Sequence, residues 1–179
     1  MKNYIIIHIL FITSNVFSQP NFPDSNAIWS VNYINSVGVP TNEMLYGLKG
    51  DTLINDTLYN KLYTLSDTTL SDENLQVYIG GFRQESQKVW FKPAYWTSSD
   101  ILLYDFSASE GDTVWHKACL HLFNNSEYTH EFLSCENFDV IQDITIENGI
   151  KKYNLLALKT VPDVWYLGIG SILGIFGPI

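Results

Sequence analysis

The chain has 179 residues, of which 46% are hydrophobic, 15% aromatic and only 16% charged. This composition excludes an intrinsically disordered chain, and the length suits about one globular domain. Nineteen acidic residues against ten basic ones leave a formal charge of −9, and no segment concentrates Lys or Arg, so nucleic acids and anionic membrane surfaces are disfavoured as partners.

The N-terminal segment has the pattern of a secretory signal peptide. Lys2 supplies a positive start, residues 4–13 form an apolar run, and Ser18 is a small residue at a cleavage position. A membrane anchor is the alternative, but the run has about half of the roughly 20 residues that a spanning helix needs. The sequence predicts a signal peptide over 1–18, a secreted or periplasmic location, and one β-rich domain over 19–179 with no membrane span.

The mature chain consists of apolar segments separated by polar turns, and no 3.6-residue apolar period persists over three turns. Residues 20–44 contain three prolines and are expected to be less regular, covering an edge or closing one end of the fold. A strand over 50–54 is predicted to turn at Asn55-Asp56 into a second strand over 57–65.

A further hairpin is predicted over 75–93, where LQVYIGGFR runs up, QESQ turns and KVWFKP runs down. Gly80-Gly81 within the first strand indicates a bulge or a close backbone approach. Residues 101–106 and 112–123 are the next two predicted strands. Asp105 lies among apolar residues of the first of these, and a structural role such as capping a turn is favoured over catalysis.

The two cysteines, Cys119 and Cys135, predict one disulfide in an exported chain. If 112–123 and 131–135 pair antiparallel in a register centred on Glu127, the two cysteines lie opposite each other, at a separation that suits a bridge. Free thiols and a metal site are the alternatives. The potential ligands are His116, Cys119, His121, His130 and Cys135, but no CxxC or HxxxH spacing occurs among them.

The segment over 140–159 is the clearest predicted hairpin. Asn148-Gly149 suits a two-residue type I′ turn, which would pair Ile144 with Tyr153. One face would then be apolar, with Val140, Ile144, Ile146, Tyr153, Leu155 and Ala157. The final segment, 167–179, is Gly-rich and too short to span a membrane, and it is expected to form a buried closing strand and a turn.

Strands at roughly ten-residue intervals predict an all-β fold: an antiparallel meander forming a curved sheet, a sandwich or a lipocalin-like barrel. No motif of catalysis accompanies them. Ser171 lies in GIGSILG, which lacks the GxSxG pattern of a nucleophile elbow and has no βαβ context for a dinucleotide. No catalytic residue, metal or cofactor is therefore predicted.

Aromatic residues are the remaining candidate site. Trp90, Tyr95 and Trp96 cluster around a predicted turn and could form a stacking platform for a ligand. The alternative is that they fill one end of the core, which is the commoner place for large aromatic side chains.

Five motifs occur in order along the chain: GDTLINDTLYNKLY, VYIGGFRQESQKVWF, LLYDFSASEGDTV, the Asn-Gly hairpin and VWYLGIGSILGIFGP. In this order they resemble the N-terminal β-rich module of secreted bacterial proteins that carry a C-terminal type IX secretion sorting domain. The resemblance covers about residues 45–178. It departs from that pattern at Leu167, where the family has Glu, and the sorting domain itself is absent. The resemblance implies secretion and a β-rich fold, and it implies no activity.

The sequence therefore predicts an exported, non-enzymatic β-module with a binding, surface or structural role, whose partner would be a glycan or a cell-envelope protein. A lipocalin-like carrier of a small hydrophobic ligand is the second hypothesis, and a secreted hydrolase is the third. A carrier requires an enclosed apolar cavity, a hydrolase requires titratable groups in a cleft, and a binding module should have an exposed aromatic patch.

Overall fold

The fold is built from antiparallel β-strands, as the sequence predicts. The computed structural model describes residues 21–34, 40–94, 99–116, 119–123, 129–133, 137–156, 163–172 and 175–176, with the backbone alone for 32–34, 40–42, 119–123 and 129–133. These residues form two antiparallel curled sheets and a separate hairpin, with one 3-10 turn and no α-helix. Within the same ranges, no helix has the length and hydropathy needed to cross a membrane.

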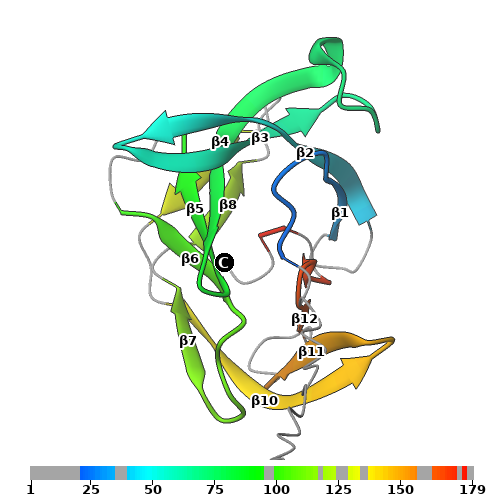
Figure 1. Cartoon of the computed structure of the whole chain (residues 1–179). Coiled ribbons are helices and arrows are strands. Elements are labelled where there is room, and N and C mark those ends of the chain that lie inside the picture. The colour runs from blue at the N-terminus through cyan, green and yellow to red at the C-terminus, as the bar shows by residue number, and fades with distance from the viewer. Residues whose placement is uncertain are drawn as a thin grey trace, which may run out of the picture.

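The first sheet has six strands in sequence order, each antiparallel to the next (Figure 1). The strands are β1 (Ile28–Ile34), β2 (Pro40–Ile54), β3 (Thr57–Leu65), β4 (Leu75–Glu85), β5 (Lys88–Pro93) and β6 (Ile101–Asp105), and the 3-10 turn η1 (Asp72–Asn74) precedes β4. Short polar turns connect most of the strands, which makes this sheet a simple meander.

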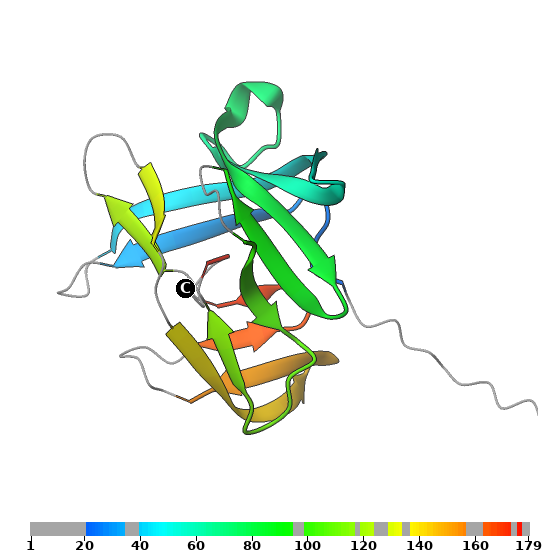
Figure 2. The same cartoon turned by 90° about the vertical axis from the view of Figure 1, so that its left-hand side faces the viewer.

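The second sheet has five strands in the spatial order β13-β12-β11-β10-β7. Its strands are β7 (Thr113–His116), β10 (Asn137–Glu147), β11 (Ile150–Leu155), β12 (Val164–Tyr166) and β13 (Gly170–Ser171). Between β7 and β10 the chain forms a separate two-stranded hairpin of β8 (Cys119–Phe123) and β9 (Thr129–Leu133). In both views the two curled sheets face each other (Figures 1 and 2).

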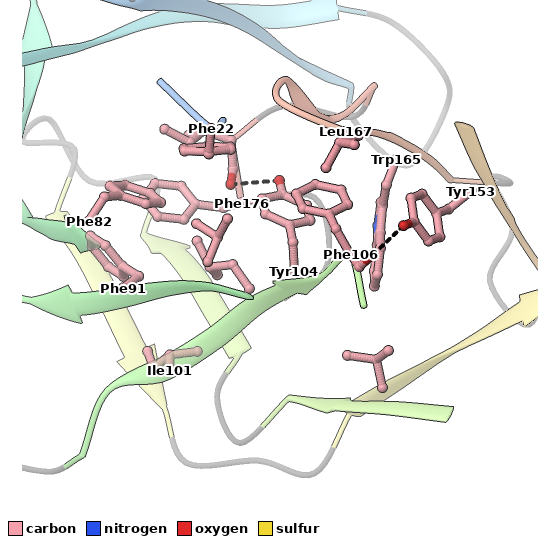
Figure 3. Packing of buried hydrophobic residues seen from close by; sticks show 14 of the residues in the cluster. Phe22, Phe82, Phe91, Ile101, Tyr104, Phe106, Tyr153, Trp165, Leu167 and Phe176 are labelled. Atoms are coloured by element: carbon pink, nitrogen blue, oxygen red, sulfur yellow. Dashed lines mark hydrogen bonds between the residues drawn. The ribbon is translucent and has the colours of Figure 1, made fainter. Parts of the chain in front are cut away.

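One buried cluster joins the inner faces of both sheets. Phe82 and Phe91 come from the first sheet, Tyr153 and Trp165 from the second, and Phe176 from the C-terminal segment (Figure 3). The Phe91 and Phe176 rings are 5.1 Å apart, and the Tyr153 hydroxyl donates a hydrogen bond to the carbonyl of Phe106. Burial of these large rings is the main source of cohesion between the sheets.

Three of the turns have the backbone conformation that tight hairpins need. Asn55-Asp56 has φ values of 49° and 61°, Ser86-Gln87 has 49° and 66°, and Asn148-Gly149 has 52° and 80°. Positive φ at both central residues is the property of type I′ turns, so the predicted turns at 55–56 and 148–149 are confirmed. The predicted QESQ turn is narrower than expected, because β4 continues through Glu85.

The glycines in β4 allow the close approach that the sequence indicated. A Cβ at Gly81 would lie 2.6 Å from Cβ of Tyr59, and one at Gly80 would lie 2.2 Å from the carbonyl oxygen of Lys92. Real Cβ atoms do not approach other atoms so closely. Tyr59 therefore packs over Gly81 on the outer face of the first sheet.

Two predictions need correction. The expected lack of regular structure over 20–44 holds for residues 21–27, but Ile28–Ile34 form the edge strand β1, which pairs with β2 from Ile28 with Gly47 onwards, and Pro40 begins β2, where a strand can accept a proline. Residues 112–123 are not one strand. They divide into β7, which pairs with β10, and β8, which pairs with β9. The apolar–polar alternation of the sequence does not reveal that the neighbouring strand changes.

The hairpin of β10 and β11 has the predicted register, with Ile144 opposite Tyr153 and Glu147 opposite Ile150. Its apolar face differs from the prediction. A register shift between Ile141 and Asp143 buries Ile141 completely, and Ile146, two residues before the turn, is 78% exposed. A bulge changes which residues face the core, and this displacement was not visible in the alternation.

The C-terminal segment closes the core in its described part. Leu167, Ile175 and Phe176 are buried, and Ile175 accepts a hydrogen bond from the Tyr104 hydroxyl at 2.9 Å through its carbonyl oxygen. The short strand β13 pairs with β12. The prediction of a buried strand and turn is confirmed for these residues, although Ile169 and Ile172 are exposed.

Candidate binding surface

Of the three aromatic residues predicted as a ligand platform, only Trp90 lies within the described residues. It is on the outer side of β5, directly opposite Arg83 of β4. The Arg83 guanidinium lies 5.3 Å from the centre of the Trp90 ring. Tyr95 and Trp96 lie outside the described residues, so the platform as predicted stays a prediction. One face of the Trp90 ring is already occupied by an arginine.

The guanidinium above Trp90 belongs to a hydrogen-bonded cluster. Arg83 Nε donates to Asp100 Oδ2 at 2.8 Å and Nη1 donates to Glu85 Oε2 at 2.6 Å. The Tyr59 hydroxyl also donates to Asp100 Oδ2, at 2.8 Å. Partial burial lowers the pKa of Arg83, but its hydrogen bonds to the carboxylates and to Tyr59 outweigh that effect and raise the pKa overall. This cluster connects β3 and β4 to Asp100, the residue that directly precedes β6.

A pair of aromatic residues lies on the outer face of the second sheet. Trp115 of β7 is directly opposite Phe138 of β10, and their ring centres are 4.9 Å apart at an interplanar angle of 45°. Trp115 is 54% exposed and Phe138 is 37% exposed. The burial of β7 alternates, with Thr113 and Trp115 exposed and Val114 and His116 buried. Two large aromatic rings are thus presented side by side to solvent.

The inner side of the same two strands carries a buried polar pair. His116 has no exposed surface, its Nδ1 lies 2.8 Å from the carbonyl oxygen of Leu102, and its Nε2 lies 3.2 Å from Asp139 Oδ2. A carbonyl only accepts, so Nδ1 carries the proton in that bond. The contact with Asp139 then needs one further proton, on Nε2 or on the carboxyl group. The pair connects β7 to β10 beneath the exposed rings.

A second buried polar group lies close to the C-terminal strand. The Ser171 hydroxyl donates to Asp163 Oδ1 at 2.5 Å, and the Ser171 amide donates to the Tyr104 hydroxyl at 3.2 Å. Burial raises the pKa of Asp163, against the effect of hydrogen bonds from Ser171 and Val164. Burial also raises the pKa of Tyr104. Ser171 is 8% exposed and bonded to a carboxylate, an arrangement that favours a role in closing the fold over nucleophilic attack.

Asp105 has the structural role that the sequence favoured. Its Oδ1 accepts hydrogen bonds from the amide and the hydroxyl of Ser107, and its Oδ2 lies 2.9 Å from Lys88 Nζ. These hydrogen bonds and the charge of Lys88 outweigh the effect of burial and lower the pKa of Asp105. The turn that it caps directly follows β6 and is not at Gly111.

The cysteine register differs from the prediction. Cys119 is opposite Leu133, so the β8–β9 hairpin is shifted by two residues relative to a register centred on Glu127. Cys135 lies outside the described residues, and the disulfide stays a prediction. Within the described ranges, no group of three or more His, Cys, Asp or Glu residues could hold a metal ion.

Comparison of the chain with protein-family models, with curated proteins and with solved structures finds no match. The candidate site is therefore identified from the geometry of the structure alone. Sequence analysis missed Trp115 and Phe138 because they are 23 positions apart and become a pair only through the β7–β10 register. Alternation along β7 places Trp115 and His116 on opposite faces of the strand, but it does not determine which of the two faces the core.

Proposed function

We propose that this chain is an exported, non-enzymatic binding module, and that the outer face of β7 and β10 is its contact surface. The exposed pair of Trp115 and Phe138 is the observation that carries the proposal. Large aromatic side chains are costly to leave in water and are the residues that dominate binding energy where they become covered. The exposed aromatic patch is the feature expected of a binding module.

The buried interior of the fold supports a binding module over a hydrolase and over a carrier. A hydrolase would need its titratable groups within reach of a substrate, whereas His116 has no exposed surface and Asp139 and Asp163 are 6% and 5% exposed. A carrier would need an apolar cavity, whereas closely packed rings lie between the sheets: the Tyr104 ring of the first sheet is 5.5 Å from the Trp165 ring of the second (Figure 3).

The first described residues are compatible with the proposed cleavage. Phe22 is buried, stacks 5.8 Å from Phe82, and its amide donates to Gln84 Oε1 at 2.7 Å. The proposed cleavage after Ser18 would retain Phe22 in the mature chain and remove only residues that precede it. The resemblance to the β-rich module of type IX-secreted proteins supports the same proposal. Sequencing the N-terminus of the secreted protein tests it, and an intact Met1 would contradict it.

Binding is tested by incubating the purified mature chain with the cell-envelope fraction of its source cells. We expect the wild-type chain to sediment with the envelope and Trp115→Ala to remain in the supernatant. Ile146→Ala is the matched control, because Ile146 is also an exposed apolar side chain, at 78%, but lies away from the aromatic pair. Equal sedimentation of wild type and Trp115→Ala would contradict the proposed surface.

A further inference from the structure

We propose that the ligand of the surface formed by Trp115 and Phe138 is an uncharged carbohydrate. This inference rests on the binding function proposed above and names its ligand class. It draws on three properties of the surface: the arrangement of its two rings, its small apolar area, and the character of the side chains around them.

The arrangement of the rings suits a sugar ring. The centres of Trp115 and Phe138 are 4.9 Å apart and their planes are inclined by 45°, so one ring can offer its face while the other contacts the edge of the same ligand. The faces of aromatic rings carry partial negative charge. The C–H groups on one face of a pyranose are apolar and weakly positive, and they complement such a surface. The two strands that hold the rings are fixed from below by the His116–Asp139 contact.

The two rings by themselves offer much less area than a stable protein interface buries. With 54% and 37% of their surfaces exposed, Trp115 and Phe138 offer roughly 200 Å² in all, given about 150–250 Å² for each aromatic side chain. A stable protein interface buries about 800 Å² on each partner. One or two sugar units match the area of the two rings, and so the compact pair favours a sugar over a second copy of this chain or another protein.

Among the residues that the structure describes, the outward neighbours of the two rings on β7 and β10 are uncharged. The described outward positions on β7 and β10 next to the pair are Thr113 and Val140, which are opposite each other in the register. The two nearest acidic side chains before β7 are engaged in the fold: Glu110 Oε1 accepts from the Ile144 amide, and Asp112 Oδ2 accepts from the Ser109 amide. The formal charge of −9 repels acidic ligands in general. An uncharged, hydroxyl-rich ligand meets no such repulsion.

Affinity electrophoresis of the mature chain in gels that contain one polysaccharide each tests this inference. The neutral probes are mannan, laminarin, xyloglucan and soluble starch, and the acidic probes are polygalacturonate and hyaluronate. We expect retardation by at least one neutral probe and by neither acidic one. Trp115→Ala should raise the dissociation constant at least about tenfold. Phe138→Leu should raise it by less, because Phe138 is less exposed.

Trp115→Phe keeps an aromatic ring on the surface and should recover most of the retardation, which separates loss of stacking from loss of folding. Ile146→Ala should be retarded like the wild type. Retardation by no neutral probe, retardation by acidic probes, or retardation that survives Trp115→Ala would each overturn the inference. If Trp115→Ala abolishes binding to the envelope while no neutral probe retards the wild type, the binding function stands and the carbohydrate assignment fails.

Discussion

Trp90 and Trp115 lie on the outer faces of the two sheets, and they have different surroundings. Trp90 of the interior strand β5 lies opposite Arg83 of β4 and Leu102 of β6, whereas Trp115 of the edge strand β7 lies opposite Phe138 of β10. Arg83 brings two carboxylates and places its charge over the Trp90 ring. Phe138 can form no hydrogen bond through its side chain, and so it leaves the Trp115 ring uncovered.

The two cases indicate that the cross-strand partner affects whether a surface aromatic ring is covered within the fold or remains in contact with solvent. Arg83 forms ion pairs with Asp100 and Glu85, and these hold its guanidinium over the Trp90 ring. The guanidinium excludes a ligand from that face of the Trp90 ring. An aromatic partner enlarges the exposed apolar surface instead. Removing individual side chains from each region should separate the two roles.

The largest expected effect is on the support beneath Trp115. Asp139→Ala should lower the free energy of unfolding by about 4 kcal/mol, because it leaves the fully buried His116 without its partner at Nε2. Urea denaturation measures the change. Thr113→Ala, an exposed position on the same strand pair, is the control and should have little effect. A loss below about 1 kcal/mol would show that the inner pair does not hold β7 to β10.

The two tryptophans should differ next in their effects on stability. Trp90→Ala should cost about 3 kcal/mol, because the mostly buried ring packs beneath Arg83. Trp115→Ala should cost about 1 kcal/mol, because 54% of the side chain is already exposed to water. Both values follow from urea denaturation under identical conditions. Equal losses for the two variants would contradict the distinction between a structural ring and a ligand-binding ring.

The charge in the Trp90 cluster should have a smaller effect than its ring. Arg83→Met keeps an apolar stem over Trp90 and removes the positive partner of Asp100, whose side chain is 16% exposed. We expect a loss of about 2 kcal/mol, between the values for buried and for surface ion pairs. Glu85→Gln is the control, because Glu85 is 68% exposed, and its denaturation midpoint should match the wild type. A matching midpoint for Arg83→Met would show that the ion pair is dispensable.

The smallest expected effect is a pH dependence from Asp163. Burial raises the pKa of Asp163 in the folded chain, so the folded state binds the proton more tightly than the unfolded state does. Its contribution to stability therefore increases as the pH falls through the folded pKa, and it is complete below the unfolded pKa. Asp163→Asn lacks this contribution.

The free energy of unfolding of the wild type minus that of Asp163→Asn should become more positive between pH 7 and pH 4. Parallel urea titrations of the two proteins at several pH values measure this difference, in which the contributions of the other carboxylates cancel. A difference that is constant or becomes more negative would show that Asp163 is not held in an unfavourable ionised state.

The tight hairpins of both sheets could be predicted because the information that specifies them is local. Asn55-Asp56 and Asn148-Gly149 specify tight turns, and a tight turn determines the register of the strands on either side of it. The Gly80-Gly81 pair likewise indicated a close approach, which Tyr59 makes. Features of this kind depend on a few neighbouring residues, and the sequence states them directly.

The candidate site could not be predicted in the same way. The sequence pattern does not reveal Trp115 and Phe138 as a pair, and it favours Trp90, although Arg83, seven positions earlier, covers one face of that ring. Both outcomes depend on which strands become neighbours. The division of 112–123 between β7 and β8 and the bulge after Ile141 also depend on distant partners, and alternation alone carries no mark of either.

The sequence by itself determined the class of the fold and its tight turns, because period-two alternation and left-handed turn residues act over a few positions. Only the tertiary structure decided which aromatic side chains face solvent, which carboxylates are buried and where the strands change sheets. Those properties arise from pairings between residues far apart in the chain. A single residue pattern cannot encode them, since the same strand can present either face to the core until its partner is in place.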